Sequence, residues 1–282
     1  MKILVIGKPV PDYQQDDLYH GLKCLNDVTV ESLTHFDYMY YDYLKDTGKL
    51  YGLGISYAMT ISSKRRILVT ESDATEKLQN GYYDAVIYLS VWRSLALINI
   101  VQAHMPKNKI VYIDGEDETH IMPRPGGLYF KRELTVCPTS TLFPISFAIA
   151  EEKLSKKEKV KLRLVSDQIP SGERKYKFKN EDEYYSDYRK SSFAITSKKA
   201  GWDCKRHYEI MANRCIPLFA DIDKCPEWTL TKFPKKFLAE IGKNWMFVNY
   251  SIHAQWREQL YNWTEDKLTT RKLAEYVLDK LS

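Results

Sequence analysis

The sequence lacks any apolar run long enough to cross a membrane. Its opening residues, MKILVIG, are apolar, but a membrane-spanning helix needs roughly 20 such residues. This opening is also too short for a secretory signal sequence, and no later segment reaches the length that a membrane span needs. We therefore expect a soluble protein without a membrane span.

Cysteine is scarce and shows no pairing pattern. Neither a C-x-x-C pair nor the spacing of a disulfide framework occurs. The five cysteines are Cys24, Cys137, Cys204, Cys215 and Cys225. This scatter favours a reducing compartment, so we expect the protein to be cytoplasmic.

A strong excess of one charge is also missing. The 42 basic and 37 acidic residues leave a formal charge of +5 and are interleaved along the chain. Such a balance suits a small anionic ligand and is too weak to indicate nucleic acid. No RNP, KH or zinc-knuckle pattern is present, so we expect no nucleic-acid partner. The sequence carries no signal for an oligomeric state.

What the N-terminal half does contain is an alternation of short apolar runs and helical patterns. Strands are expected at residues 2–7, 28–30, 66–70, 85–89 and 109–113, and helices at 15–24, 75–79 and 94–104. Short connections between them predict an α/β fold with a parallel sheet. Ligands bind beyond the carboxyl ends of such strands, where Asp73, Ser90, Arg93 and Asp114 fall.

The charged stretch 151–159, EEKLSKKEK, has no hydrophobic face and predicts a domain boundary. We expect one domain at residues 1–152, a second at 153–260, and a C-terminal helix within 261–282 that packs back on the first domain. In the second half, strands are expected at 162–165, 193–196 and 216–220, and helices at 184–190, 204–212 and 264–282. Thr264 is the expected cap of the last helix.

Three segments leave two interpretations open. The tyrosine- and glycine-rich residues 36–59 could stack on sugar faces or cover a domain edge. The acidic run 114–120 offers carboxylates and a histidine to a metal, but it also fits a solvated turn. Residues 131–133, Lys-Arg-Glu, follow a Pro/Gly-rich loop at 123–127. They could hold a phosphate or the far domain, or form a surface ion pair.

The segment from Thr196 to Pro234 contains the strongest candidate site. Lys198 and Lys199 precede Gly201 and Trp202, and an expected helix at 204–212 begins directly after them. Backbone N–H groups and the positive end of the helix dipole bind anions, and the lysines add charge. A glycine here would let the backbone approach a phosphate closely. The segment therefore predicts a diphosphate site.

Two side chains on the expected helix complete this site. Asp203 is placed to cap the helix, Arg206 lies near its start, and Glu209 is one turn deeper. Residues three apart share a helix face, so Arg206 can reach a phosphate while Glu209 accepts hydrogen bonds from a ribose. His207 lies on another face, where a packed histidine is at least as good an interpretation as a ligand.

The run Gly201 to Ile222, GWDCKRHYEIMANRCIPLFADI, resembles the donor-binding segment of exostosin-like (family 47-like) glycosyltransferases. The shared features are an Arg and a Glu on one helix, followed by Cys215-Ile216-Pro217. The resemblance implies two facing Rossmann-like domains (GT-B type) and a helix that binds a nucleotide sugar. The compact length is most similar to xylosyltransferases of large algal viruses, which implies UDP-xylose and a host cytoplasm. Arg214 departs from the family, whose members usually have glycine there.

The expected chemistry is inverting, metal-independent transfer from a UDP-sugar to a glycan acceptor. Lys198, Lys199 and Arg206 would stabilise the leaving diphosphate without a metal or other cofactor. The base should come from the other domain. Asp73, beside Glu71 at an expected strand end, is the first candidate, and Asp12 and Asp114 are the reserves.

Two other function classes remain as alternatives. Asp221-Ile-Asp223 resembles the D-x-D motif of single-domain, metal-dependent glycosyltransferases (GT-A type), and only such an enzyme should lose activity in EDTA. A nucleic-acid-binding protein is the third class, suggested by the basic charge and the 21 tyrosines. A steep loss of oligonucleotide affinity with salt would indicate it.

Overall fold

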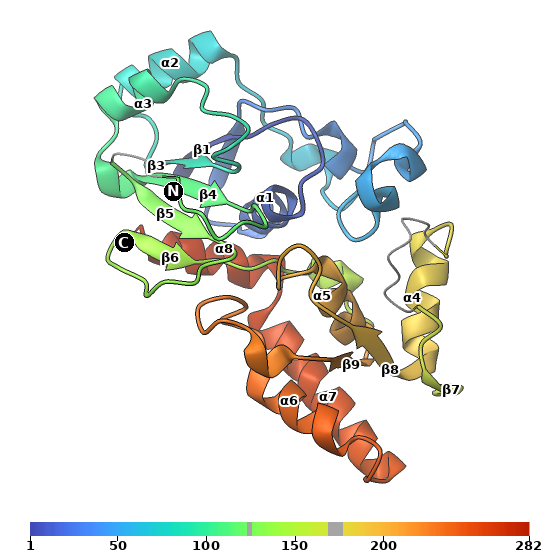
Figure 1. Ribbon diagram of the computed structural model, residues 1–282. Coiled ribbons are helices and arrows are strands. Elements are labelled where there is room, and N and C mark those ends of the chain that lie inside the picture. The colour runs from blue at the N-terminus through green and yellow to red at the C-terminus, as the bar shows by residue number, and fades with distance from the viewer. Residues whose placement is uncertain (123–125, 169–176, 282) are drawn as a thin grey trace.

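The computed structural model describes residues 1–122, 126–168 and 177–281, which form two lobes (Figure 1). The first lobe is built on a six-stranded sheet with order β2-β1-β3-β4-β5-β6, in which all neighbours are parallel. Its elements are β1 (Lys2–Ile6), α1 (Tyr13–Cys24), β2 (Thr29–Ser32), α2 (Glu71–Gln79), β3 (Ala85–Tyr88), α3 (Ile98–His104), β4 (Ile110–Asp114), β5 (Leu128–Lys131) and β6 (Leu142–Pro144).

The second lobe has a parallel sheet of three strands, in the order β7-β8-β9. Its elements are β7 (Arg163–Val165), α4 (Glu181–Lys190), β8 (Ser191–Thr196), α5 (Lys205–Ala212), β9 (Ile216–Phe219), α6 (Lys235–Asn244) and α7 (Tyr250–Lys267), and α8 (Thr270–Asp279) ends the chain. The expected α/β class with parallel sheets is confirmed. The domain limits at 152 and 260 stay a prediction.

The six-stranded sheet is covered on both faces, and β1 shows why. Its alternate residues enter two different cores: Ile3 and Val5 pack with α1 and α8, whereas Leu4 and Ile6 pack with α2 and α3. A strand buried on both faces must be apolar at every position, as KILVI nearly is. Among the described residues, no helix combines the length and apolar character that crossing a membrane requires.

The strand expected at 66–70, with Asp73 at its end, is wrong. Residues 66–70 make only an isolated bridge, between Leu68 and Ser32. Helix α2 starts immediately afterwards because Thr70 and Asp73 form a capping box, in which each side chain accepts from the other's backbone N–H. The helix expected at 94–104 begins only at Ile98, because Leu97 has a left-handed backbone with φ 57°.

The helix expected at 264–282 is also wrong, since two helices meet there. Thr264 lies inside α7, where its hydroxyl donates to the Leu260 carbonyl, and Thr269 is the residue that caps α8. Ser282 lies outside the described residues. Helix α8 (red in Figure 1) packs against α1 of the first lobe. Gly21 permits this approach, because a Cβ there would lie 1.9 Å from the Thr270 carbonyl oxygen.

A buried histidine joins both lobes and the connecting segment. His20 on α1 contacts Thr270 Oγ1 through Nδ1 at 2.7 Å and Glu152 Oε1 through Nε2 at 2.9 Å. Burial lowers the pKa of His20, but hydrogen bonds with Cys24 and Glu152 outweigh it and raise the pKa to about 9. The imidazolium–carboxylate pair therefore helps to hold the lobes together at neutral pH.

This pair should make stability depend on pH. A histidine pKa raised by folding contributes stability that is complete below its unfolded value, about 6.5, and is lost as pH rises through about 9. We expect His20→Gln to remove much of the decline in unfolding free energy between pH 6.5 and 9, measured by urea titration. His104→Gln, at an exposed histidine, should leave the decline as in the wild type. Parallel pH profiles for wild type and His20→Gln would contradict the assignment.

Candidate functional site

A cavity of about 780 Å³ lies between the two lobes. Its walls come from the loops that follow β1, β3 and β4 in the first lobe and β7 and β8 in the second, together with the start of α5. The carboxyl ends of both parallel sheets therefore face one space, which is where ligands bind in open α/β sheets. The volume falls in the range of roughly 300–1,000 Å³ found for small-molecule sites.

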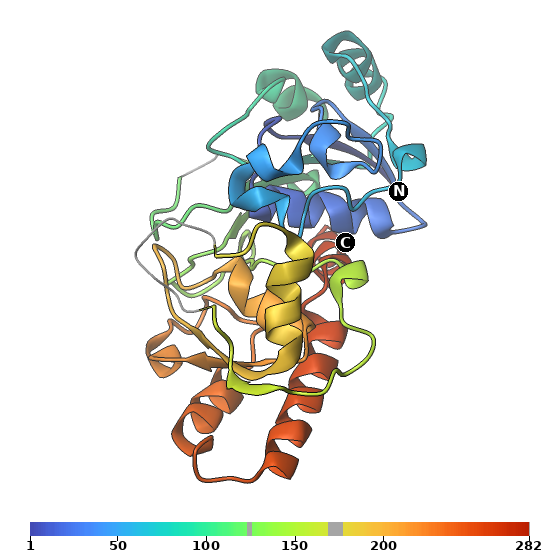
Figure 2. The same cartoon turned by 90° about the vertical axis from the view of Figure 1, so that its right-hand side faces the viewer.

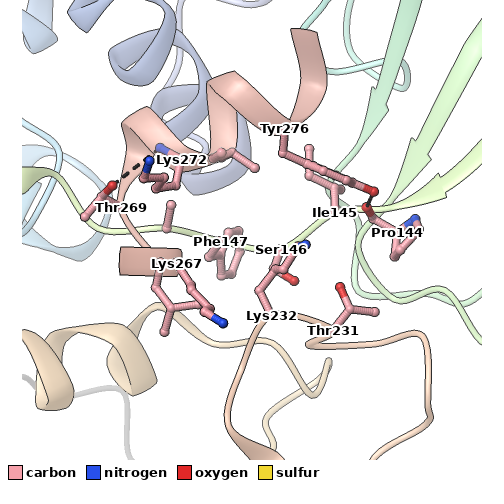
Figure 3. Close-up of a pocket in the computed structure, with 13 residues that line it drawn as sticks. Pro144, Ile145, Ser146, Phe147, Thr231, Lys232, Lys267, Thr269, Lys272 and Tyr276 are labelled. Carbon is pink, nitrogen blue, oxygen red and sulfur yellow. Dashed lines mark hydrogen bonds between the residues drawn. The ribbon is translucent and has the colours of Figure 1, made fainter. Parts of the chain in front are cut away.

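A second hollow between the lobes is much smaller, about 40 Å³. Figure 3 shows it between the chain after β6 and the start of α8, with Tyr276 directed at Pro144. The Tyr276 hydroxyl donates to the Pro144 carbonyl oxygen at 2.9 Å. The hollow has room for little more than a water molecule, so the large cavity is the candidate site.

The start of α5 opens on the large cavity without a side-chain cap. Cys204 occupies the N-cap position and makes no capping hydrogen bond, so the expectation that Asp203 caps this helix is wrong. The Asp203 carboxylate turns away and accepts from Phe147 N at 2.7 Å and from the Tyr208 hydroxyl at 2.9 Å. Burial raises the pKa of Asp203 to about 7. The first turn of α5 therefore has no anionic side chain as its cap.

The turn before α5 is already occupied by a carboxylate of the protein. The N–H groups of Trp202 and Asp203 donate to Glu133 at 3.1 and 2.9 Å. A Cβ on Gly201 would lie 2.5 Å from Glu133 Oε1, so the glycine makes room for this contact. The backbone of the turn was expected to bind phosphate, and the structure gives these two donors to Glu133 instead.

Arg132 fixes the same turn from the first lobe. Its buried guanidinium donates to the Asp203 carbonyl oxygen at 2.6 Å and to the Gly115 carbonyl oxygen at 2.8 Å, and it pairs with Asp117 and Glu133. Of the interpretations open for residues 131–133, the contact with the far lobe is confirmed. A buried ion pair between Lys205 on α5 and Asp17 on α1 adds a second link.

Two cations remain beside the uncapped helix start. Arg206 is half-buried and lines the cavity, and its guanidinium has no hydrogen bond or ion pair with any described residue. Lys199 also lines the cavity, where burial and the charge of Arg206 lower its pKa. Lys198 is exposed beside the Trp202 ring, 5.3 Å from its centroid. Lys198, Gly201 and Trp202 do not line the cavity.

Glu209 lies deeper on the same face of α5, as its spacing from Arg206 predicts. It lines the cavity but is only 5% exposed. One carboxylate oxygen accepts from the Tyr184 hydroxyl at 2.8 Å and the other from the Ser56 hydroxyl. Burial raises the pKa of Glu209, whereas these two hydrogen bonds lower it. A carboxylate oxygen can accept two hydrogen bonds, so each retains capacity for a ligand hydroxyl.

The three carboxylates considered as a base lie in different places. Asp73 is exposed on α2, on the side of the first lobe away from the second (Figure 1), and it belongs to a capping box. Asp114 is fully buried and binds Lys131 at 2.9 Å and the Tyr129 hydroxyl at 2.6 Å. Only Asp12 of the three lines the cavity.

Asp12 is held firmly at the cavity wall. It is the N-cap of α1, and its Oδ1 accepts from the N–H groups of Gln14 and Gln15 at 3.0 and 3.2 Å. Its Oδ2 pairs with Arg93 at 2.7 Å, and Arg93 in turn reaches Glu116 at 3.3 Å. Of the polar residues expected at strand ends, Arg93 joins Asp12 at this cavity.

Part of the tyrosine-rich segment covers the first lobe, and its stacking on sugars stays a prediction. Tyr38 and Tyr57 are buried against the first lobe, whereas Tyr51 is 65% exposed and lines the cavity. Its ring centroid lies 5.6 Å from that of Tyr13, the neighbour of Asp12. Tyr13, Tyr51 and Asp12 therefore all line the same cavity.

Of the residues weighed as metal ligands, Glu116 and Asp117 of the acidic run line the cavity, whereas Asp114 is buried behind it in its pair with Lys131. Asp221 pairs with Lys224 on an exposed turn after β9, and neither Asp221 nor Asp223 lines the cavity. Among the described residues, no group of three His, Cys, Asp or Glu side chains is arranged to hold a metal ion. His207 is a packed histidine between Thr196 and the Trp202 carbonyl, and burial lowers its pKa to about 3.

Figure 2 shows, from the side, the two lobes that form this cavity. This two-lobed chain can be superimposed on a glycosyltransferase from Rickettsia africae ESF-5, with a TM-score of 0.56. The two have the same overall fold. The match covers 99% of this chain and 97% of the other, at 8% sequence identity. No protein-family model matches the sequence, and no curated protein sequence matches it significantly.

Several site residues were missed by sequence reasoning. Ser56 reaches Glu209 from a position 153 residues away, and no local pattern connects such distant positions. Glu133 was considered only as part of residues 131–133, and its contact with the turn 70 residues further along was not expected. Tyr184 belongs to an expected helix, but nothing in its spacing relates it to Glu209. Of the missed residues, only Lys205 could have been found from the sequence. It lies at the first position of the helix that was already expected to bind an anion.

Proposed function

We propose that this protein transfers a sugar from a nucleotide-sugar donor to a hydroxyl group of a glycan. The observation that carries the proposal is the uncapped start of α5 facing the cavity, with Arg206 and Lys199 beside it. A helix start with two cations suits a diphosphate. Support also comes from the fold shared with the Rickettsia africae glycosyltransferase.

The donor is proposed to lie along α5. Its diphosphate contacts Arg206, Lys199 and the first N–H groups of the helix, and its ribose hydroxyls donate to Glu209. When the sugar–oxygen bond breaks, negative charge grows on the diphosphate, and cations already in position stabilise it. We propose UDP as the nucleotide, and xylose as the sugar, from the resemblance to exostosin-like and viral enzymes. Lys198, Gly201, Trp202 and Asp203 would then shape this segment from outside the donor contacts.

The acceptor is proposed to lie against the first lobe. A sugar ring stacked on Tyr13 and Tyr51 would bring a hydroxyl near Asp12, because Tyr13 follows Asp12 directly and the two rings are 5.6 Å apart. Asp12 would remove the hydroxyl proton as the oxygen attacks. Asp12 belongs to the first lobe and α5 to the second, and we propose that the acceptor attacks opposite the leaving group, which would invert the configuration at the sugar. We propose Asp12 in preference to Asp73, which lies outside the cavity.

The diphosphate charge is proposed to be balanced by protein cations, without a metal ion. The test is a set of thermal unfolding scans with UDP, UDP-xylose, UDP-glucose and UDP-N-acetylglucosamine, each with and without EDTA. A donor at about 100 times its Kd should raise Tm by on the order of 5 °C, equally with EDTA. Release of UDP on adding free oligosaccharides would then identify transfer. A donor shift abolished by EDTA would favour the metal-dependent alternative, and no shift with any nucleotide sugar would contradict the proposal.

A further inference from the structure

A short piece of the first lobe is inserted among the helices of the second. Ile55 is buried in a cluster formed by Tyr184, Tyr185 and Tyr188 of α4 and Ile210 of α5. Leu53 packs against the same cluster. These apolar contacts bring residue 56, the next residue along the chain, against α5.

The backbone of this piece has an unusual conformation. Gly52, Leu53, Gly54, Ser56 and Met59 all have positive φ angles, and that of Ser56 is 73°. Glycine adopts this region without cost, whereas other residues are strained in it. Such strain persists where the surroundings hold it and it often marks a functional site. A glycine at position 56 would avoid this strain, but it would lack the hydroxyl group that Ser56 provides.

The Ser56 side chain is fully engaged with the second lobe. It is 2% exposed, and its hydroxyl donates to Glu209 Oε1. The Tyr185 hydroxyl lies 2.7 Å from Ser56 Oγ, within hydrogen-bond distance. The Ser56 N–H donates to Glu181 Oε1 at 3.0 Å, and the other oxygen of Glu181 pairs with Lys153 at 2.7 Å. Ser56 thus has a fixed position and a fixed donor direction.

We infer that Ser56 is a positioning residue for the donor, which it serves by orienting the Glu209 carboxylate from the opposite lobe. The inference rests on the proposed function, in which Glu209 accepts the ribose hydroxyls. A glutamate side chain rotates about several bonds, and only hydrogen bonds at both oxygens stop it. Tyr184 fixes one oxygen from α4 and Ser56 fixes the other. The acceptor positions of the Glu209 oxygens that remain unused then keep a fixed direction at the cavity wall. There they can accept hydrogen bonds from the two ribose hydroxyls.

The test compares Ser56→Gly and Ser56→Ala by UDP titration in a calorimeter and by thermal unfolding. Glycine suits the left-handed backbone, so Ser56→Gly should unfold at the wild-type Tm or above while its affinity for UDP falls about tenfold. Ser56→Ala should lose the same affinity with a lower Tm. Met59→Gly is the matched control, because Met59 is left-handed in the same loop but is not one of the residues that hydrogen-bond to Glu209. Its UDP affinity should equal that of the wild type.

The results separate this inference from the proposed function. If the wild type fails to bind UDP, the proposed function is contradicted and the inference with it. If the wild type binds UDP and Ser56→Gly binds it equally well, the inference alone is overturned. An equal loss of affinity in Met59→Gly would also overturn it, because the effect would then come from loosening the loop.

Discussion

Replacing Asp12 by Asn should lower the rate of sugar transfer by about 10²–10⁴-fold, the usual contribution of a general base. The affinity for UDP should stay within about twofold of the wild type, because the proposed donor contacts are Lys199, Arg206 and Glu209 and do not include Asp12. Asparagine caps a helix about as well as aspartate, so α1 should keep its N-cap. The measurements are kcat with donor and acceptor at saturation, and the Kd of UDP by calorimetry.

Asp73→Asn is the matched comparison for this prediction. Asp73 also lies at a helix start, in the capping box of α2, but it is exposed and far from the cavity. We expect its kcat to equal that of the wild type. The opposite pattern, with transfer lost in Asp73→Asn and retained in Asp12→Asn, would identify Asp73 as the base, as first expected from the sequence.

Replacing Arg206 by Ala should weaken UDP binding by about 100-fold, which corresponds to about 2.7 kcal/mol. Its guanidinium lines the cavity without another partner among the described residues, so binding the diphosphate would break no existing ion pair. Arg206→Lys should recover part of the loss, because lysine keeps the charge but not the paired donors of arginine. Calorimetric titration with UDP provides the measurement.

Lys198→Ala is the control for Arg206. The two residues belong to the same cationic segment, but Lys198 is exposed outside the cavity. Its removal should change UDP affinity by less than about threefold at physiological salt, since exposed charges are screened. Equal losses in Lys198→Ala and Arg206→Ala would indicate a diffuse attraction to the whole segment and would count against a specific contact at α5.

The α5 segment shows how far local patterns extend. A helix was expected at 204–212, after the lysine–glycine turn, and α5 spans Lys205–Ala212. The three-residue spacing put Arg206 and Glu209 on one face, and both line the cavity. The prediction that Asp203 caps this helix was wrong, because the tertiary structure determines which groups the Asp203 carboxylate contacts. It turns to Phe147 and Tyr208 and leaves the helix start uncapped.

The region around Asp73 shows a second kind of limit. The apolar run before it was interpreted as a strand, which would have placed Asp73 at the edge of the sheet. Thr70 and Asp73 carry the pattern of a capping box, and that local signal decides the start of α2. A few apolar residues fit a strand or a loop equally well. Their pairing depends on whether a neighbouring strand is free, and here only a single bridge forms.

The sequence by itself determined the parallel α/β architecture and the helix that carries Arg206 and Glu209, because periodicity and spacing are properties of neighbours along the chain. Only the tertiary structure decided that Glu133 occupies the turn, that Ser56 reaches Glu209, and that Asp12 lines the cavity. Those contacts join segments from different lobes. Such partners are chosen by the way the two sheets pack, and no pattern within either segment encodes that packing.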